Sequence, residues 1–406
     1  MKRRFALVAL IVFCTAALAL MPALASPQDP AGKTGDSEKF LRMGNDAIAG
    51  HYIVVLDMDS AGKSGDLFTA AKTASDLTLA YGGVATNFYA YAINGFSARM
   101  SEAEALKLSS DPRVKFVEED SIMSANITQN NPPWGLDRIG QRDLPLNQTY
   151  SYTTTGSGVN VYIIDTGIRR THTQFGGRAF VGFDSVGDGQ NTNDCNGHGT
   201  HVSGTVGGST YGVAKAVRLF AVRVLNCSGS GSNAGVIAGV DWVTANHTNP
   251  AVANMSLGGG VSTALDTAVN NSINSGVTYA IAAGNSNTDA SNSSPARVAA
   301  AITVGSSTIN DARSSFSNFG SVVDIFAPGS SILSSYNTSD TATATLSGTS
   351  MASPHVAGVA ARYLQSNPGA SPATVRNAIV NAATLNHLSG IPAGTANRLL
   401  FWSSAQ

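Results

Sequence analysis

Three residues of the sequence carry the side chains that nucleophilic catalysis requires. The first, Ser350, lies in the segment Gly348–Pro354, just ahead of an apolar run. Proline is tolerated in the first turn of a helix, so Ser350 is expected at a helix amino terminus. Free N–H groups and the positive end of the helix dipole there favour a developing oxyanion beside the hydroxyl. A serine in this setting is more often a helix cap, so its role depends on its partners.

The other two residues supply a base and a carboxylate. His198 lies between Gly197 and Gly199 at an expected helix start, and imidazole is the natural base for a serine hydroxyl near neutral pH. Asp165 ends an apolar strand, so its carboxylate needs a partner, and orienting an imidazole is one such task. Asp165 could equally be a cap at a strand-to-helix turn. His201 could pair with His198 on a metal, but no acidic residue accompanies them at metalloprotease spacing, so no catalytic metal is expected.

The order of the three residues along the chain is the informative feature. An α/β-hydrolase places its acid and histidine after the serine, whereas here both precede it. The order Asp, His, Ser distinguishes the chain from the other two common arrangements of serine hydrolases.

The elements that must position these residues alternate between strands and helices. From residue 134 onward, short apolar runs alternate with Gly-rich turns and helix-length segments, as in a parallel sheet covered by helices on both faces. Active sites of such folds lie at the carboxyl ends of strands. The clearest expected strands are residues 159–164, 216–224, 251–255 and 277–282.

A smaller α/β unit precedes this part of the chain. Residues 26–46 read as a linker, and residues 47–125 as a small domain without a catalytic constellation. Its expected elements are strands at 52–56, 86–99 (a pair) and 113–117 with helices at 67–82 and 102–109. Binding or assisting folding is its expected role.

The chain begins like an exported protein. Basic residues, the apolar stretch 5–20, Pro22 and a small-residue pattern predict a signal peptide, residues 1–25, rather than a membrane anchor. Cleavage removes Cys14 and leaves Cys195 and Cys227, which should pair in an oxidising compartment unless both are buried thiols. A net charge of −1 gives no reason to expect nucleic acid, and no later segment is long and apolar enough for a membrane.

The motifs around the three residues resemble those of the subtilisin superfamily, and within it the proteinase K branch with its aqualysin-like secreted enzymes. Asp165-Thr166-Gly167, the segment 198–201 and the segment 348–352 carry the likeness, which extends from about 133 to 401. The resemblance implies a three-layer α/β peptidase domain at 126–406 and a secreted, monomeric serine endopeptidase that acts through an acyl-enzyme. By the same resemblance, Asn285 is the oxyanion donor.

The resemblance also assigns substrate-binding residues. Two Gly-rich segments are similar to those that bracket an extended peptide as an added strand, and a third would line a roomy, uncharged primary pocket that prefers apolar or aromatic residues. Each run could otherwise be an ordinary loop. The residues are Ser228, Gly229, Ser230 and Gly231, then Ser256, Leu257, Gly258 and Gly259, and for the pocket Ala282, Ala283 and Gly284.

The small domain is similar to the inhibitory propeptides of this family, with a ferredoxin-like fold. It is expected to assist folding, to occupy the active site of its own chain, and to be removed by autoprocessing within 124–127. The chain is thus expected to be made as a zymogen whose partners are protein or peptide substrates and its own propeptide.

Structural calcium is the cofactor that the resemblance implies, held by hard oxygen ligands. One expected site comprises Asp324 with the carbonyls of Ala299 and Ala301. A second, incomplete because Gly140 replaces a carboxylate, comprises Asp137, Gln141 and Asn147. A third acidic set could bind calcium or be solvated: Asp184, Asp188 and Asp194.

The resemblance pairs Cys195 with Cys227, a bridge that would join the loop before His198 to the Ser228 segment. Two alternatives from other classes remain, a catalytically silent binder with the same fold and an extracellular esterase. The intact triad and Asn285 argue against the first, and only cleavage of peptides separates the second.

Overall fold

The computed structural model describes residues 39–43, 47–57, 66–121 and 127–403. These residues form two compact units that divide between Ile122 and Met123. The predicted signal peptide, Cys14 and most of the predicted processing segment lie outside the described residues.

The N-terminal unit is a five-stranded sheet with two helices. The chain order of its elements is β1 (Phe40–Leu41), β2 (Ala47–Leu56), α1 (Leu67–Tyr81), β3 (Val84–Tyr89), β4 (Gly95–Arg99), α2 (Glu102–Ser109) and β5 (Val114–Ser121). The sheet order is β1-β5-β2-β4-β3, and the four strands from β2 onward pair antiparallel. From β2 onward the elements follow the predicted chain order of strand, helix, strand pair, helix and strand.

One segment of this unit departs from the prediction. Phe40–Leu41 falls in the predicted linker, yet it pairs parallel to β5, and Phe40 is buried against the ring of Tyr52. Two residues are too few to show periodicity in the sequence, and it is the burial of Phe40 that stabilises this short strand at the edge of the sheet.

The C-terminal unit is built on a nine-stranded, mostly parallel sheet. Its order is β19-β20-β16-β15-β13-β11-β8-β10-β9, with only the terminal β19–β20 pair antiparallel. The strands are β8 (Asn160–Asp165), β9 (Ala179–Asp184), β10 (Arg218–Arg223), β11 (Ala251–Met255), β13 (Val277–Ala282), β15 (Ile302–Ser307), β16 (Ile325–Pro328), β19 (Thr384–Leu385) and β20 (Arg398–Leu399). Strands β11 and β13 have the predicted bounds.

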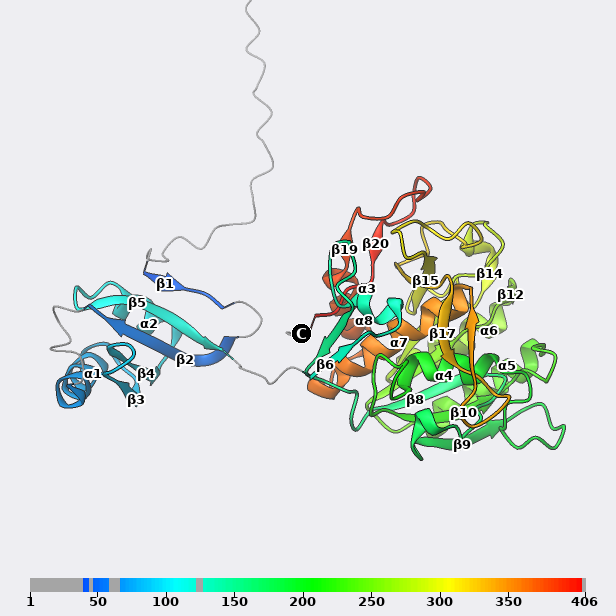
Figure 1. The fold of residues 1–406 in the computed structure, drawn as a ribbon, viewed down its shortest axis with the longest axis horizontal. Helices are drawn as coiled ribbons and strands as arrows, with labels where there is room; N and C mark the ends of the chain where they lie inside the picture. The colour runs from blue at the N-terminus through cyan, green and yellow to red at the C-terminus, as the bar shows by residue number, and fades with distance from the viewer. Residues whose placement is uncertain (1–38, 44–46, 58–65, 122–126, 404–406) are drawn as a thin grey trace, which may run out of the picture. The chain divides into compact units, whose positions relative to one another are not determined.

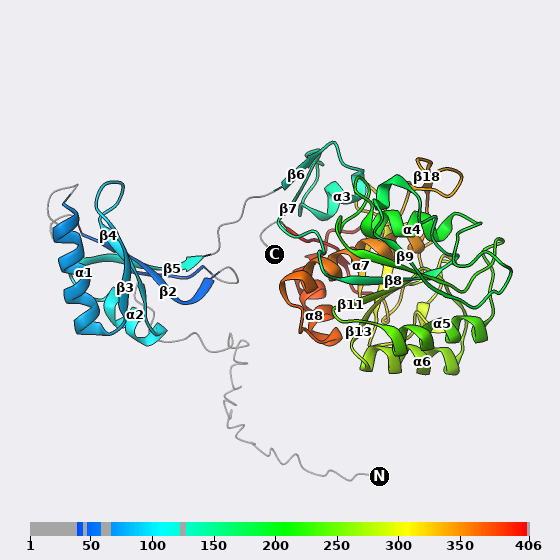
Figure 2. The same ribbon diagram turned by 90° about the horizontal axis from the view of Figure 1, so that it is seen from below.

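Helices cover both faces of this sheet, which gives the three-layer fold. Helices α5 (Asn233–Asn246) and α6 (Thr263–Asn274) lie side by side on one face, and α4 (His198–Gly207), α7 (Thr349–Ser366) and α8 (Pro372–Ala382) lie on the other (Figure 2). Alternate residues of β8 enter the two cores, with Val161 and Ile163 facing α4 and α7, and Tyr162 and Ile164 facing α5 and α6. Two-sided burial explains the continuous apolar runs in the sequence.

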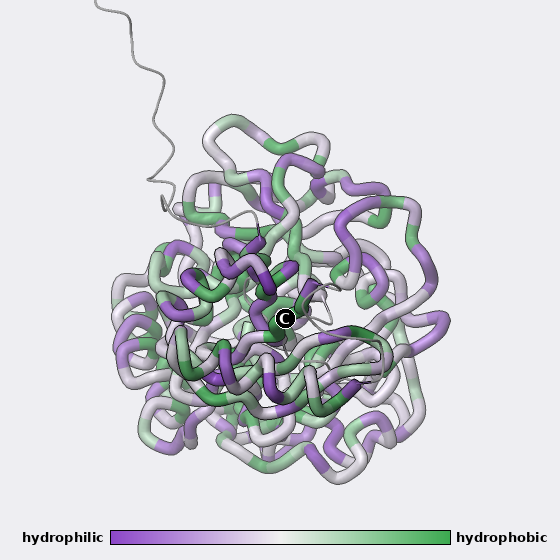
Figure 3. The backbone as a smooth tube through the Cα atoms, turned by 90° about the vertical axis from the view of Figure 1, so that its left-hand side faces the viewer, coloured by the Kyte–Doolittle hydropathy of each residue, from purple (hydrophilic) through white to green (hydrophobic). Residues whose placement is uncertain are grey.

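Short elements complete the unit around the sheet. A helix, α3 (Trp134–Ile139), and three antiparallel pairs lie outside it: β6 (Ile127–Asn130) with β7 (Thr149–Tyr152), β12 (Gly259–Gly260) with β14 (Ser293–Ser294), and β17 (Ile332–Ser335) with β18 (Thr343–Leu346). Hydrophobic stretches are short and interrupted by hydrophilic residues (Figure 3), and no helix in the described residues could cross a membrane.

Candidate active site

The carboxyl end of β8 meets the amino end of α4 at Asp165 and His198. Asp165 is fully buried, and its Oδ1 accepts hydrogen bonds from His198 Nδ1 at 2.8 Å and from the backbone N–H of Thr166 at 2.7 Å. Strand β8 is an interior strand that lies between β10 and β11, so its end is fixed from both sides. The carboxylate therefore sets the orientation of the imidazole and places the proton on Nδ1.

The electrostatics of His198 favour its protonated form. Burial alone lowers the pKa of the imidazole, but the charge and hydrogen bond of Asp165 and the charge of Asp194 outweigh it, and the pKa of His198 is raised above its usual value. His201, one turn along α4, donates from Nε2 to the carbonyls of Ile332 and Ala344, and burial lowers its pKa to about 4. His201 is thus a neutral packing residue, and His198 is the titrating one.

Ser350 is the second residue of α7, as the proline in its first turns predicts. Its hydroxyl donates to the backbone carbonyl of Ser256 at 3.1 Å, and the Ser256 hydroxyl donates to the carbonyl of Ser350 at 2.8 Å. Among the described residues no hydrogen bond joins Ser350 Oγ to His198. The candidate nucleophile is therefore held against Ser256, the residue that follows strand β11.

Asn285 is anchored by one end of its amide. Its Oδ1 accepts from the backbone N–H of Thr349 at 2.8 Å and from the Thr349 hydroxyl at 2.9 Å. Because the oxygen is occupied, the Nδ2 group is the end directed away from Thr349, at an exposed position next to the start of α7. Thr349, the residue before Ser350, thus orients the amide, a role that the sequence did not reveal.

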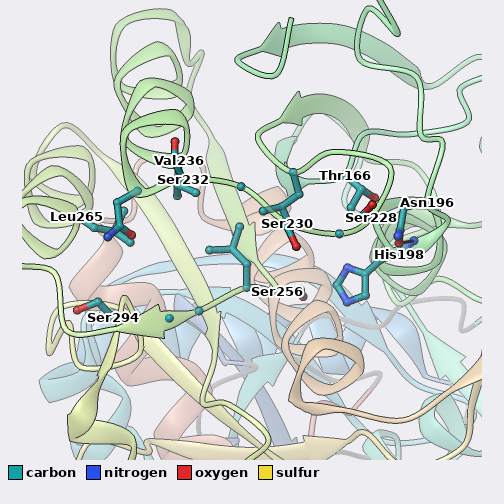
Figure 4. A pocket seen from close by; sticks show the side chains of 17 residues that line it. Thr166, Asn196, His198, Ser228, Ser230, Ser232, Val236, Ser256, Leu265 and Ser294 are labelled. Carbon is teal, nitrogen blue, oxygen red and sulfur yellow. Dashed lines mark hydrogen bonds between the residues drawn. The ribbon is translucent and has the colours of Figure 1, made fainter. Parts of the chain in front are cut away.

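A cleft of about 550 Å³ runs away from His198 between two loops. The predicted substrate segments 228–231 and 256–259 form its walls, and His198 lies at one end with Val236 and Leu265 at the other (Figure 4). Leu225 and Leu257 also line it, and Ser232 and Ser294 lie near the Val236 and Leu265 end, so the lining is of mixed polarity. The cleft brings together all eight residues of the two segments that we expected to bracket an extended peptide.

The predicted primary pocket residues lie outside this cleft. Ala282 ends β13 and Ala283 is fully buried, while Gly284 has a positive φ of 103° and donates its N–H to the Thr349 hydroxyl. These three residues connect β13 to Asn285, and their role as pocket walls remains a prediction.

A comparison with protein-family models matches residues 156–398 to the subtilase family. The chain belongs to the subtilase family. The match contains Asp165, His198, Asn285 and Ser350, and the chain is accordingly a subtilisin-like serine protease. Residues 51–126 match a second model, peptidase inhibitor I9, which agrees with the predicted propeptide.

Several named relatives are similar to this subtilase. Alkaline serine exoprotease A of Vibrio alginolyticus is 52% identical over 365 residues, which are 87% of this chain and 68% of the relative. The extracellular serine proteinase of Thermus sp. strain Rt41A is 56% identical over 313 residues, 77% of this chain and 76% of the relative. The crystal structure of a cold adapted subtilisin-like serine proteinase covers 67% of this chain and 98% of its own, with 57% identity and a TM-score of 0.65.

The predicted disulfide of the subtilase is present between Cys195 and Cys227. It joins the loop before His198 to the start of the 228–231 wall of the cleft. Asn226, which was not predicted from the sequence, holds the backbone of this wall in its turn. Its Oδ1 accepts hydrogen bonds from the backbone N–H groups of Ser228 and Ser230. An Asn just before a Gly- and Ser-rich turn was the available signal.

The carboxylates of the third acidic set have partners within the protein. Asp184 and Asp188 both pair with the fully buried guanidinium of Arg223, at 3.0 and 2.6 Å. Asp194 instead accepts hydrogen bonds around the start of α4. An internal cation thus neutralises the first two carboxylates, which the sequence could not show because Arg223 lies on the distant strand β10.

The first predicted calcium site is engaged by a side chain. Asp324 is buried, its Oδ2 accepts from the N–H of Thr303 at 2.9 Å, and its Oδ1 pairs with the guanidinium of Arg376. Arg376 Nε also donates to the carbonyl of Ala301 at 3.3 Å. Two of the predicted ligand oxygens therefore already contact a cation, so a calcium ion fits only if Arg376 moves.

The second predicted calcium site has a carboxylate oxygen that is less engaged than those of Asp324. Asp137 is 3% exposed, its Oδ2 accepts from the N–H of Gln148 at 2.8 Å, and its Oδ1 is buried without a partner among the described residues. Burial raises the pKa of this carboxyl. Gln141 Oε1 accepts from the N–H of Asn147, which closes the neighbouring loop. An unpartnered buried carboxylate oxygen in a loop rich in oxygen atoms suits a calcium ion.

Proposed function

We propose that this subtilase is a secreted serine endopeptidase in which Ser350 is the nucleophile, His198 the general base and Asp165 the residue that orients the base. The contact of 2.8 Å between Asp165 Oδ1 and His198 Nδ1 carries the proposal. It leaves Nε2 as the basic nitrogen of an imidazole that lines the cleft. The name of the Thermus relative, an extracellular serine proteinase, supports the location.

In the first step the Ser350 hydroxyl turns from the Ser256 carbonyl to His198 Nε2, gives up its proton and attacks the substrate carbonyl carbon. The tetrahedral oxyanion receives hydrogen bonds from Asn285 Nδ2 and the backbone N–H of Ser350 at the start of α7. His198 then protonates the leaving amine, and the acyl-enzyme is hydrolysed by water through the same groups.

The peptide lies extended between the two walls of the cleft, where backbone groups of 228–231 and 256–259 provide most of its hydrogen bonds. Ala282, Ala283 and Gly284 carry no charge, which supports a broad preference for apolar or aromatic residues at the primary pocket. A peptide that is acetylated and amidated at its ends tests the endopeptidase assignment, because an exopeptidase needs a free terminus.

The N-terminal unit acts as propeptide, folding aid and intramolecular inhibitor, and the chain cuts itself within 124–127. The match to peptidase inhibitor I9 supports this role. Calcium stabilises the mature unit, with Asp137, Gln141 and Asn147 as the better supported ligands and Asp324 with the carbonyls of Ala299 and Ala301 as a further site. The mature enzyme is proposed to act as a monomer.

Amino-terminal sequencing of the exported product, with and without Ser350→Ala, tests the proposal. The unchanged chain is expected to begin within 125–128, and the variant to retain its propeptide. A mature product from the variant purified alone contradicts autoprocessing. Fluorophosphonate labelling of Ser350 with ester but no peptide hydrolysis identifies an esterase instead, and neither labelling nor hydrolysis identifies a silent binder.

A further inference from the structure

Asp194 occupies a central place that the acyl-transfer roles above leave unexplained. It lies in the loop between β9 and α4 and is 3% exposed. Its Oδ1 accepts from the Thr166 hydroxyl at 2.9 Å and from the N–H groups of Asn196 and Gly197 at 2.9 and 2.8 Å. Its Oδ2 accepts from the N–H and the hydroxyl of Thr200 at 2.8 and 2.6 Å.

All five groups that face Asp194 are donors. A carboxylate accepts from all of them, whereas an amide or a protonated carboxyl presents a donor of its own to at least one. The hydroxyls have their acceptor sides engaged as well, since Thr166 Oγ1 accepts from the N–H of Gly199 at 2.9 Å and Thr200 Oγ1 from the N–H of Arg169 at 2.9 Å. The site is therefore built around a buried negative charge.

These bonds connect the two partners of the proposed triad. The N–H of Thr166 donates to Asp165 Oδ1, the same oxygen that faces His198 Nδ1. The Thr166 hydroxyl bonds both to Asp194 and to the first turn of α4. The carboxylate thus joins the residue after Asp165 to the backbone just before and just after His198.

We propose that Asp194 is a positioning residue for the Asp165–His198 pair, and that its buried charge stabilises the imidazolium formed when His198 takes the Ser350 proton. This inference depends on the catalytic roles proposed above for His198 and Ser350. The helix start is where a positive dipole end faces the imidazolium, so a carboxylate that caps this end offsets an unfavourable field.

The charged and titratable groups around His198 define what the pH profile can report. Asp165 on β8 and Asp194 in the loop before α4 both raise the pKa of His198. His201 on α4 is the neighbouring imidazole. Arg223 on β10 pairs in register with Asp165, but its guanidinium is bound by Asp184 and Asp188. Removing the Asp194 charge therefore lowers the pKa of His198.

Asp194→Asn in the full-length chain tests the proposal, with Thr200→Val as the matched control. Asp194→Asn is expected to move the acid limb of kcat/KM to lower pH and to reduce kcat about tenfold with KM unchanged, because the base is misplaced while the cleft is intact. Thr200→Val removes a bond at the same site but keeps the charge, so it should lower Tm without moving the acid limb. Equal pH profiles and kcat for Asp194→Asn and wild type overturn the proposal.

A second pair of variants covers the case in which Asp194→Asn yields no folded enzyme. Thr166→Val keeps the charge and cuts the connection from Asp165 to α4, and it should lower kcat about tenfold at unchanged KM. Thr166→Ser, which retains the hydroxyl, should restore kcat. Wild-type kcat in folded Thr166→Val contradicts the positioning role. Peptide hydrolysis and Ser350 labelling of the wild type are measured first, so a failure of the proposed function itself is seen separately.

Discussion

At the scale of single residues, the amide of Asn285 is the clearest test of oxyanion stabilisation. Asn285→Ala should lower kcat about 10²- to 10³-fold with little change in KM, the usual loss for one such donor in this family, because the donor acts on the charge that develops in the transition state. Steady-state kinetics with a peptide substrate measure it. Thr349→Val is the control: it keeps the N–H that holds Asn285 Oδ1 and removes only the hydroxyl, so its loss should be smaller.

The charge state of His198 gives a second prediction at this scale. The base must be neutral, and the pKa of His198 is raised. Activity should therefore be lost as the pH falls through a midpoint above the usual histidine value, and be fully present above it. The pH dependence of kcat/KM, which reports the free enzyme, measures this midpoint. A midpoint below the usual value would contradict the electrostatic account of Asp165 and Asp194.

At this scale the sequence marks the residues proposed to carry chemistry but not the residues that hold them in place. Asp165, His198 and Ser350 stand in recognisable motifs, whereas Asn226, Arg223 and Arg376 act through contacts with residues distant along the chain or through a local turn. Asp194 was noticed only as one of three acids in a loop. Its true partners, Thr166 and Thr200, belong to other motifs, and only the fold brings them together.

At the scale of elements, the close approach of α4 to the end of β8 depends on Gly199. A Cβ at this position would lie 2.2 Å from the carbonyl oxygen of Gly167 and 3.2 Å from Asp165 Oδ1. Backbone cannot yield easily, so Gly199→Ala should push α4 away from Asp165 and lower kcat by up to about 10²-fold. Gly207→Ala in the same helix is the control, because its Cβ meets only the side chains of Val217 and Leu219.

The control separates stability from geometry. Gly207→Ala is expected to change Tm with kcat near that of the wild type, since Gly207 is the last residue of α4 and His198 is the first. If both variants lower Tm equally and neither changes kcat, the close approach at Gly199 has no catalytic importance.

The disulfide acts between two loops rather than within the sheet. It closes a separation of 32 residues and joins the approach to His198 to the 228–231 wall. The double change Cys195→Ser with Cys227→Ser should cost roughly 3 to 4 kcal/mol of unfolding free energy by the chain-entropy argument and raise KM, because the wall loses its anchor. Denaturant unfolding and peptide kinetics measure both. If the free energy of unfolding and KM are both unchanged, the disulfide neither stabilises the fold nor holds the 228–231 wall for substrate binding.

At the scale of the whole molecule, the layer order was predictable because each central strand is buried on two faces and each helix on one. The same rule failed at the margins. The strand Phe40–Leu41 and the outer pair β17–β18 form through pairing between segments that are separated in the sequence. Strands of two or four residues are too short to show an apolar periodicity. The boundary of the two units, which the sequence placed at 125, lies in a polar stretch without an apolar pattern to mark it.

Calcium is the stabilising ligand that we propose for the C-terminal unit, and we propose Asp137 rather than Asp324 as its anchor. Asp137 Oδ1 is buried and has no hydrogen-bond partner in the described part of the chain, so calcium would supply one, whereas Arg376 already neutralises Asp324. Chelation of the active enzyme should therefore lower Tm, and added calcium should restore it by the linkage between binding and folding.

Asp137→Asn should abolish most of this calcium-dependent shift. Asp324→Asn should lower Tm by leaving Arg376 unpaired, with or without calcium. Calorimetric titration after chelation decides between the two carboxylates, and a full calcium response in Asp137→Asn together with none in Asp324→Asn would reverse the assignment.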